Sequence, residues 1–503
     1  MSYLGIDLGT SGLRALLVDA NGAPVASTEA HYPVANPHSG WSEQDPADWI
    51  EALETVIAKL RAEQPLFAEL SGIGVAGHMH GAVLLDAGEA VLRPCILWND
   101  TRSAAEAATL DADPNFRTFS GNIVFPGFTA PKLAWVRAHE PDIFAQVAKV
   151  LLPAAFLNLY LTGQAVGDIS DAAGTSWLDV GKRAWSDPLL AATGLGVAQM
   201  PRLVEGSAVA GQLRADLARD WGVAATVCVA GGAADNAAAA CGMGVLSEGQ
   251  GFVSLGTSGV VLAARGGYHP DPETALHTFC HAIPETWYQM GVMLSATDCL
   301  NWLSRITGQS PSDLTAELGT QLATPSDVQF LPYLSGERTP HNDASLRGSF
   351  TGLSVTTTRA DMTRAVLEGV AFGLRDSMEA IRGTGARLET VYAIGGGARS
   401  SYWLRLLATV FDTPLLVPND GEFGAALGAA RLAVVAVTGA RPQTVMTPPT
   451  QVSRVLPCTE LAAVYEDAYR RFEARTYATR KAGTVSTGSL SPPRQDDCRR
   501  LPL

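Results

Sequence analysis

The chain opens with short apolar runs separated by one amphipathic segment. Residues 3–9 (YLGIDLG) and 13–19 (LRALLVD) have the length and apolar content of strands, and the glycine-rich sequence between them predicts a tight turn. Apolar residues then recur at helical spacing over 45–63, behind an aspartate that favours a helix start. Residues 70–79 (LSGIGVAGHM) return to the strand pattern. This alternation of strands and helices predicts an α/β fold.

The second half of the chain repeats this order. Residues 250–265 (QGFVSLGTSGVVLAAR) have another strand, turn and strand pattern, and helical periodicity follows at 359–385 and 400–412. The turn sequence LGTSG is identical at 8–12 and 255–259. The same turn in two similar settings predicts two related α/β domains.

The joint between these domains is expected between Gly244 and Gly251, after an apolar strand, a glycine loop and an alanine-rich helix. The chain is therefore divided into an N-terminal domain, 1–245, and a C-terminal domain, 246–479. The remaining residues, 480–503, are rich in Ser, Pro, Gly and Arg and predict a flexible tail outside the fold.

Composition narrows the class of protein. The 503 residues are 47% hydrophobic and 17% charged, which is typical of a globular enzyme with more than one core. The net charge of −14, with no cluster of Lys or Arg, argues against a nucleic-acid partner. Seven scattered cysteines without a C-x-x-C pair predict reduced thiols and a cytoplasmic location. No signal peptide or 18-residue apolar run is found, so no membrane association is expected.

The two LGTSG turns contain groups that could bind an anion. Each exposes successive backbone N–H groups and two hydroxyls, Thr10 and Ser11 in the first copy, and such concave turns bind anions. Either copy alone could be a plain hairpin turn. Two copies on two similar domains favour a polyphosphate held between them.

Two aspartates lie at positions where the predicted α/β domains would bind a ligand. Asp7 immediately precedes the first turn on a buried strand, and a carboxylate beside a phosphate requires a cation between them, which predicts Mg²⁺ held partly through water. Asp235 follows an apolar strand and a glycine loop and precedes a helix. It could be only a helix cap, or it could take the proton of an alcohol acceptor.

Three other glycine patterns bear on nucleotide binding. No G-x-x-x-x-G-K-[ST] sequence occurs, which excludes a P-loop site. The G-x-G-x-x-G at Gly72, Gly74 and Gly77 lies inside strand-like sequence, so it predicts close packing rather than dinucleotide binding. Residues 395–397 form a glycine loop between a strand and a helix, where a backbone can lie close to a flat ligand or a phosphate.

Nine segments together resemble the FGGY family of carbohydrate kinases, in collinear order from Tyr3 to about Arg475. They read GIDLGTSG, GHMHGAVLLD, LWNDTR, GFTAPKLAWV, SDAAGTSWLD, SLGTSGV, FLPYLSGERTPHND, RAVLEGVAFGLRD and IGGGARSSYW. The resemblance implies two actin-like, ribonuclease H-like ATPase domains of the hexokinase, Hsp70 and actin superfamily around a central cleft. It further implies ATP and Mg²⁺ in the cleft, a sugar on the N-terminal domain, and a homodimer. The implied reaction is ATP-dependent phosphorylation of D-xylulose at its 5-hydroxyl, which feeds xylose catabolism.

Position by position, the resemblance also implies the site residues. The catalytic base is Asp235 and the metal-associated acid is Asp7. The sugar contacts are Met79, His80 and Gly81, with Trp98, Asn99, Asp100 and Asp235 itself. The nucleotide contacts are Thr10 and Ser11 of the first turn, Gly256 and Thr257 of the second, and Gly396, Gly397 and Ala398 of the third glycine loop.

Two positions depart from the family pattern. Alanines occupy 233 and 234, where glycine is common before the base, so the backbone geometry there is an open question. His78 stands where glutamine is usual, which bears on ketose preference. His78 and His80 would also permit a zinc site, but no third ligand follows at a useful spacing, and the histidines at 277–281 are not expected to meet them.

Other functions stay open from the residues alone. A related kinase could act on ribulose, glycerol or gluconate. An Hsp70-like or actin-like ATPase would share the paired turns, but it would need a peptide-binding domain or a polymer surface, and only a short tail is left for one.

Overall fold

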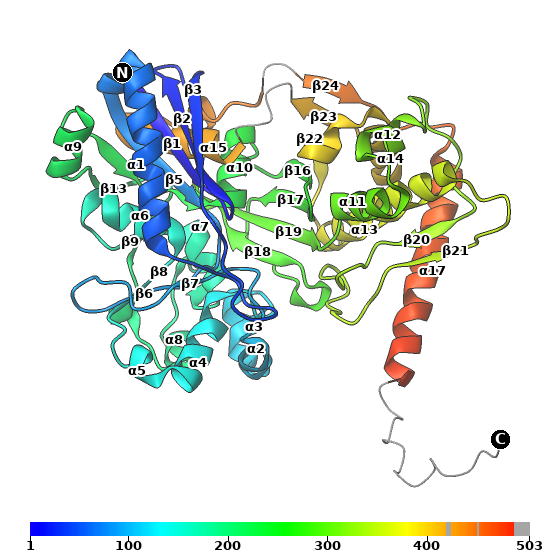
Figure 1. The fold of residues 1–503 in the computed structure, drawn as a ribbon, viewed down its shortest axis with the longest axis horizontal. Helices are drawn as coiled ribbons and strands as arrows, with labels where there is room; N and C mark the ends of the chain where they lie inside the picture. Colours follow the sequence, from blue (N-terminus) through cyan, green and yellow to red (C-terminus); the bar gives the residue numbers. More distant parts are fainter. Residues whose placement is uncertain (419–423, 450–451, 487–503) are drawn as a thin grey trace, which may run out of the picture.

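The computed structural model describes residues 1–418, 424–449 and 452–486. Two α/β halves lie side by side, the first running from blue to green and the second from green to red in Figure 1. Among the described residues, no helix is both long enough and apolar enough to cross a bilayer.

A seven-stranded mixed sheet forms the centre of the first half. The predicted hairpin consists of β1 (Ser2–Leu8) and β2 (Gly12–Asp19), which pair antiparallel, and β1 also pairs in parallel with β5 (Leu70–Gly77). The sheet order is β13 (Val209–Gln212), β14 (Cys228–Ala230), β5, β1, β2, β3 (Pro24–His31), with β15 (Ala233–Ala234) beside the end of β5.

A second seven-stranded sheet forms the centre of the other half. Here β16 (Gly249–Leu255) and β17 (Gly259–Arg265) make the second predicted hairpin, and β16 pairs in parallel with β22 (Leu388–Ile394). The sheet order is β18 (His277–Cys280), β19 (Trp287–Met293), β17, β16, β22, β23 (Leu415–Pro418), β24 (Val452–Val455).

The two sheets have the same internal order. The path β3, β2, β1, β5, β14, β13 has the same sequence of parallel and antiparallel pairings as β19, β17, β16, β22, β23, β24. Strand β18 is an addition at the edge of the second sheet. The prediction of two related α/β domains is therefore confirmed at the level of topology, and both LGTSG turns join the equivalent pair of strands.

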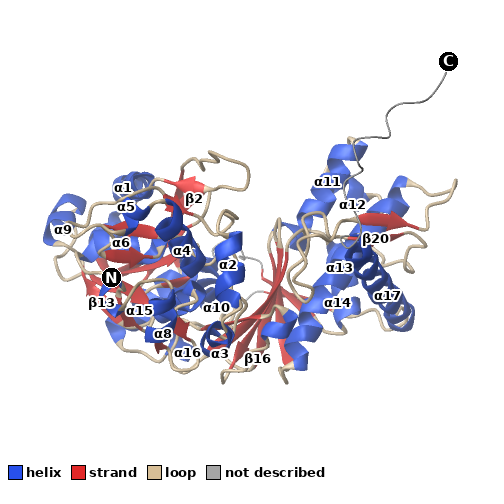
Figure 2. Cartoon of the chain, turned by 90° about the horizontal axis from the view of Figure 1, so that it is seen from below, coloured by secondary structure: helices blue, strands red, loops and turns tan. Residues whose placement is uncertain are grey.

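Helices cover the faces of both sheets (Figure 2). In the first half these are α1 (Pro46–Glu63), α6 (Pro153–Thr162), α9 (Ala215–Trp221) and α10 (Asp235–Met243). In the second they are α11 (Thr297–Thr307), α12 (Pro311–Ala316), α13 (Arg359–Gly383), α14 (Ser401–Phe411) and α17 (Ala462–Ser486). Helix α1 begins as predicted, because the Asp45 side chain accepts the N–H of Ala47 at 2.9 Å.

Shorter elements complete the chain. The helices are α2 (Ala104–Asp111), α3 (Pro114–Ser120), α4 (Thr129–His139), α5 (Pro141–Phe144), α7 (Ile169–Ala172), α8 (Asp187–Ala192) and α16 (Pro442–Val445). The strands are β4 (Glu43–Gln44), β6 (Val83–Leu85), β7 (Cys95–Ile96), β8 (Lys149–Leu151), β9 (Val166–Asp168), β10 (Leu178–Asp179), β11 (Ala184–Trp185), β12 (Arg202–Val204), β20 (Gln329–Leu331) and β21 (Ser349–Thr351). The 3₁₀ turns are Pro65–Glu69, Ala173–Thr175, Val197–Gln199, Pro272–Thr274 and Gly396–Arg399.

One helix from late in the chain belongs spatially to the first half. Helix α15 (Gly424–Thr438), orange in Figure 1, packs against β1, β5 and α10. The packing is so close that a Cβ at Gly74 would lie 1.9 Å from the carbonyl oxygen of Ala429. The glycines of the G-x-G-x-x-G sequence thus lie in a packed strand, as predicted, and the chain after residue 423 returns to the N-terminal sheet.

The C-terminal end differs in one respect from the sequence expectation. Helix α17 continues to Ser486, past the expected start of the tail at 480, and buries Tyr465 and Phe472 against the second core. Residues 487–503 of the predicted tail lie outside the described residues.

Candidate active site

The first LGTSG turn is held from behind by three side chains. The Tyr32 hydroxyl donates to the Gly9 carbonyl at 2.6 Å, and the Gln44 amide donates to the Thr10 carbonyl at 2.6 Å. The Trp98 indole N–H donates to the Thr10 hydroxyl at 3.0 Å. Because these contacts occupy the carbonyl oxygens, the turn keeps a fixed shape in which backbone N–H groups remain for an anion.

The second turn is held in a different way, by a helix start. The backbone N–H of Thr297 donates to the Gly256 carbonyl at 3.0 Å, and the Thr297 hydroxyl donates to the same oxygen at 2.8 Å. The N–H of Ala296 donates to the Thr257 carbonyl at 2.8 Å. The first turn of α11 thus fixes the carbonyl side of the loop, again leaving N–H groups on its other side.

Asp7 lies on β1 and Asp235 at the start of α10, near enough for the charge of Asp235 to act on Asp7, and both are half-buried. Burial raises the pKa of Asp7 to about 7, with the nearby charge of Asp235 adding to the effect. Burial raises the pKa of Asp235 to about 6, although the backbone and side-chain N–H groups of Asn236 stabilise its charged form. Two carboxylates with raised pKa values at one place favour a cation or a transferable proton between them.

The alanine directly before Asp235 has a backbone conformation that does not require glycine. Ala234 has φ −56° and ψ 147°, which any L-residue adopts, so glycine is not needed at this position. Its N–H donates to the Ser170 hydroxyl at 3.1 Å, and that hydroxyl donates to Asp168 at 2.5 Å. It is Gly232, at φ +89°, that requires glycine, since a Cβ there would lie 2.2 Å from the Val75 carbonyl oxygen.

The predicted sugar pair lies in a turn directly after β5. Met79 is buried, and the Tyr288 hydroxyl of the second half approaches its sulfur at 3.9 Å. His80 is half-buried, stacks on Phe128 with ring centroids 4.5 Å apart, and contacts the Gly174 carbonyl through Nδ1 at 2.6 Å. Its neighbour Gly81 packs against Pro153, where a Cβ would lie 2.7 Å from the proline ring.

His78 points away from this turn. Its ring is buried edge-on against Trp49, with centroids 5.5 Å apart, and its backbone N–H donates to the Leu8 carbonyl. Burial lowers the pKa of His78 to about 3, so the ring is neutral. The residue that departs from the family pattern is therefore packed beside Trp49, and only its backbone hydrogen-bonds to the residue that begins the first turn.

The three residues Trp98, Asn99 and Asp100 have different environments. Trp98 and Asn99 are exposed, and Trp98 reaches the first turn through Thr10. The Asp100 side chain is buried in a structural ion pair with Arg102 and accepts the backbone N–H of Ser42 at 2.6 Å. Asp100 thus shapes the loop that presents its neighbours, and the interpretation of its carboxylate as a direct sugar contact is not supported by this geometry.

One expectation about the histidines was wrong. His277, on β18 of the second half, stacks on Phe279 at 5.2 Å, and Phe279 lies 6.2 Å from the His80 ring. Burial lowers the pKa of His277 well below its usual range, with Arg338 and then His80 contributing. The second sheet therefore reaches the predicted sugar turn. Within the described residues, no three or more His, Cys, Asp or Glu side chains are grouped so that they could hold a metal ion.

The third glycine loop lines a pocket of about 360 Å³. Gly396 and Gly397 form one wall, and Asn301, Ser400 and Trp403 contribute others. Thr297 also lines it, the residue that fixes the Gly256 carbonyl. Of the predicted nucleotide residues of the second half, Gly396 and Gly397 line this pocket, and Gly256 is connected to it through Thr297. Ala398 lies in the 3₁₀ turn Gly396–Arg399 and does not line the pocket.

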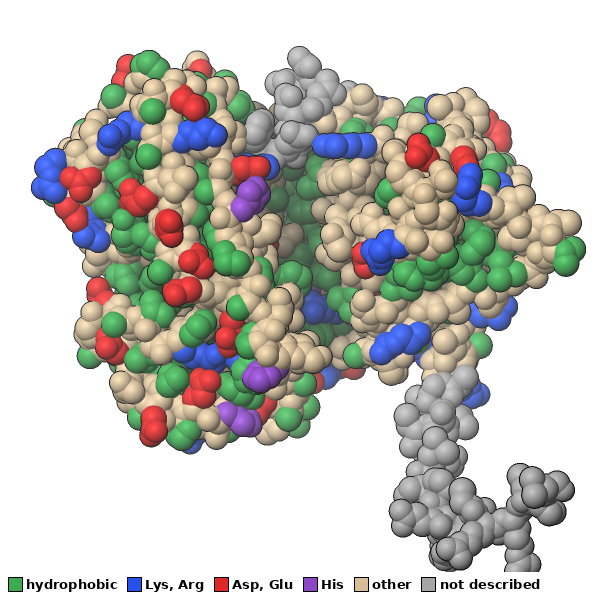
Figure 3. Space-filling model, viewed as in Figure 1, with side chains coloured by type: hydrophobic (Ala, Val, Ile, Leu, Met, Phe, Trp, Pro, Cys, Tyr) green, Lys and Arg blue, Asp and Glu red, His purple; other side chains and the backbone are tan. Residues whose placement is uncertain are grey.

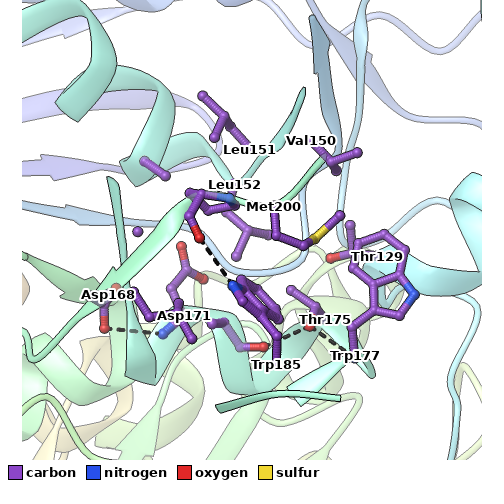
Figure 4. Close-up of a pocket in the computed structure, with 15 residues that line it drawn as sticks. Thr129, Val150, Leu151, Leu152, Asp168, Asp171, Thr175, Trp177, Trp185 and Met200 are labelled. Carbon is purple, nitrogen blue, oxygen red and sulfur yellow. Dashed lines mark hydrogen bonds between the residues drawn. The ribbon is translucent and has the colours of Figure 1, made fainter. Parts of the chain in front are cut away.

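Two acids that the sequence did not single out lie behind Asp235. Asp171 lines a narrow cavity together with apolar side chains such as Leu152 and Met200 and with the polar Thr129, Thr175 and Asp168. Its backbone N–H donates to the Asp168 carboxylate (Figure 4). No described residue hydrogen-bonds to its carboxylate oxygens. Burial, and then the charges of Asp168 and Asp235, hold the pKa of Asp171 well above its usual range. The motif SDAAGTSWLD contained this residue, but no spacing rule marks a single buried acid.

The surface between the halves is hollowed, with hydrophobic side chains in its depth (Figure 3). The halves also contact each other directly. The Asn122 side chain donates to the Thr278 carbonyl and accepts the Thr278 N–H, both at 2.9 Å, as a neighbouring strand would. The Arg183 guanidinium donates to the carbonyl of Thr286 at 2.7 Å. The sugar turn is thus built where the two halves meet.

Comparisons with known proteins agree with this architecture. Residues 2–242 match the N-terminal domain, and residues 251–437 the C-terminal domain, of the FGGY family of carbohydrate kinases. The xylulose kinase of Escherichia coli (strain K12) is 48% identical over 438 residues, which cover 86% of this chain and 90% of that protein. The xylulose kinase of Bacillus subtilis (strain 168) is 38% identical over 440 residues, covering 86% of this chain and 88% of that protein.

Solved structures give the same result. A crystal structure described as a xyloylose kinase from Brucella ovis superimposes with a TM-score of 0.95 at 57% identity, over 96% of this chain and all of that one. A glycerol kinase from Plasmodium falciparum shares the fold, with a TM-score of 0.83 at 19% identity over 97% of this chain and 99% of that one.

The fold and its matches define a sugar kinase with two actin-like, ribonuclease H-like domains. More narrowly, the chain belongs to the FGGY family of carbohydrate kinases.

Proposed function

We propose that this chain phosphorylates D-xylulose at its 5-hydroxyl with ATP. The observation that carries the proposal is the proximity of Asp7 and Asp235 beside a glycine turn with a fixed shape, in a chain 48% identical to a xylulose kinase. An alcohol acceptor needs a carboxylate that can take its proton near neutral pH, and a pKa of about 6 suits Asp235 to that role.

Each group of residues in the proposed site has its own role. Asp235 orients the sugar hydroxyl and accepts its proton as the phosphorus–oxygen bond forms, while ADP leaves with the electron pair of the broken bond. The N–H groups of both turns neutralise charge on the phosphates, with the Thr10 and Thr257 hydroxyls beside them. Gly396 and Gly397 allow the adenosine to lie against the backbone in the 360 Å³ pocket.

Magnesium fits the residues that are present. Asp7 would hold Mg²⁺ together with phosphate oxygens and water, since this ion commonly takes only one or two protein carboxylates. When bound, Mg²⁺ supplies positive charge that offsets the phosphates. Burial, and then the charge of Asp235, makes the ionised form of Asp7 unfavourable without a partner, and a bound cation would offset that cost.

The sugar contacts are proposed at the turn after β5. His80 and Met79 face the junction with Tyr288 and Phe279, and Trp98 lies across the first turn. The described cysteines carry no disulfide, which suits a reducing compartment such as the cytoplasm. A homodimer stays a prediction.

A panel of acceptors tests the proposal. ADP release is measured with D-xylulose, D-ribulose, glycerol and gluconate at matched concentrations and constant Mg-ATP. We expect kcat/KM for D-xylulose to exceed that of every other acceptor by at least about 100-fold, because a site that pairs specific hydroxyls rejects substrates that leave its polar groups unmet. Preference for another acceptor would replace the proposed substrate, and peptide-stimulated ATP hydrolysis without sugar dependence would reject the class.

A further inference from the structure

Lys132 is a fully buried lysine that no feature of the reaction yet explains. It lies in the first turn of α4, with none of its surface exposed. Its amino group donates to the carbonyl oxygen of His80 at 2.8 Å. The Thr129 hydroxyl, on the same helix, donates to the same oxygen at 3.2 Å. A buried ammonium group is unfavourable unless its contacts compensate, so its placement on one particular carbonyl requires an explanation.

The carbonyl in question belongs to a residue in a rare conformation. His80 has φ +70°, in the left-handed region that a non-glycine residue seldom adopts. Such conformations persist where surrounding contacts fix them, and they gather at functional sites. The two donors from α4 hold the His80 peptide in this orientation.

The same turn fixes the imidazole ring. Nδ1 lies 2.6 Å from the Gly174 carbonyl oxygen, which can only accept, so Nδ1 carries the proton of the neutral ring. Burial, and then the nearby charge of Lys132, lowers the pKa of His80 to about 3, which keeps the ring neutral. Nε2 is then left as an acceptor. Gly174 leaves room for this arrangement, because a Cβ there would lie 2.6 Å from the His80 ring.

We propose that Lys132 is a positioning residue for sugar recognition: through the His80 carbonyl it holds the left-handed turn that presents Nε2 of His80 to the acceptor as a hydrogen-bond acceptor. The proposal deepens the proposed function and rests on it. Its chemical consequence is that the acceptor must offer a hydroxyl at this point, and that an analogue lacking this hydroxyl binds poorly.

Two substitutions and a matched control test the role of Lys132. Lys132→Met keeps the length and apolar stem but removes the donor, and Lys132→Gln keeps a neutral donor. The control is Lys149→Met, because Lys149 also donates to a backbone carbonyl of the same half, that of Ala198 at 2.7 Å, away from the sugar turn. KM and kcat for the preferred sugar and for ATP are measured together with the melting temperature.

We expect Lys132→Met to raise the sugar KM at least about tenfold while kcat and the ATP KM change less than about threefold, with partial recovery in Lys132→Gln. Nitrogen-15 NMR of histidine should show a single His80 tautomer, protonated at Nδ1, in the wild type and a mixture in Lys132→Met. An unchanged sugar KM, or sugar and ATP KM values rising together with a lower melting temperature, would overturn the proposal.

If Lys132→Met does not fold, Thr129→Val replaces it, since this change removes the other donor to the same carbonyl. The sugar KM should then rise by a few-fold with the ATP KM unchanged, and no rise would reject the positioning role. Failure of the proposed function is distinguishable, because the wild type itself would then phosphorylate no sugar in the panel.

Discussion

The two halves of the molecule share a strand order and an identical five-residue turn, yet they differ in what stands beside that turn. In the first half Asp7 precedes the turn and side chains such as Tyr32 and Gln44 brace it. In the second half Ser254 takes the place of Asp7, and the start of α11 braces the turn. The same turn thus occurs in both halves, whereas a carboxylate precedes it in the first half only.

The largest expected effect tests that acid chemistry. Asp235→Asn should lower kcat by about 10²–10⁴-fold, the range for loss of a general base, while sugar and nucleotide still bind. Rapid-quench single-turnover kinetics and calorimetric binding measure the two parts separately. Turnover close to the wild-type value in a folded variant would show that Asp235 is not the base.

The next test compares equivalent positions in the two halves. Asp7→Asn should lower kcat by about 10²-fold and weaken the apparent affinity for Mg²⁺, because the carboxylate next to the phosphate turn is lost. The matched change Ser254→Ala should leave both quantities within about threefold of wild type. Equal losses at both positions would remove the asymmetry between the halves.

A bulky side chain in the second turn should act on nucleotide alone. The nearest protein atom to a Cβ at Gly256 would be the Ser258 carbonyl oxygen at 3.4 Å, so the fold can accept the group, but the space on which the phosphates are proposed to lie would be filled. Gly256→Val should therefore weaken ATP binding by about tenfold with little change in melting temperature. Gly266→Val is the control, because a Cβ there meets nothing within 4 Å. A loss of sugar binding without a loss of ATP binding would contradict the assignment.

The smallest effect is a pH dependence. The active forms of Asp7 and Asp235 are both ionised, and their pKa values are raised to about 7 and about 6. The ratio kcat/KM should therefore be level at higher pH, begin to fall near pH 7 and fall more steeply below about pH 6, where both groups take up protons. An initial-rate profile in constant Mg-ATP measures this fall. A flat profile down to the ordinary aspartate range would show that the group governing the rate is not buried.

Much of the fold could be predicted because its signals are local. The hairpins, helix α1 with its Asp45 cap and the packed glycines of β5 each follow from spacing within a short segment. The return of α15 to the first sheet could not be predicted, because it depends on contacts between residues far apart in sequence: Gly74 of β5 packs against Ala429, and Gly428 packs against Ala238 of α10.

The residues of the site likewise fall into two groups, those with a local sequence signal and those without one. Asp7, Asp235 and the glycine loops stand at strand ends, where α/β sheets place ligands, so their positions carry a signal. Lys132 and Asp171 carry none, since a single buried charge has no periodicity and is recognised only by what surrounds it. The approach of His277 to His80 was missed for a related reason: it arises from contact between the halves.

The central claim is that both LGTSG turns hold one nucleotide while the sugar is bound by the first half near His80. Hydrogen exchange followed by mass spectrometry tests it directly, with the enzyme alone, with a non-hydrolysable ATP analogue and Mg²⁺, and with D-xylulose. We expect the nucleotide to slow exchange in both 8–12 and 255–259, and the sugar to slow exchange around 78–81 without protecting the second turn. Protection of only one turn by the nucleotide, or of neither, would contradict it.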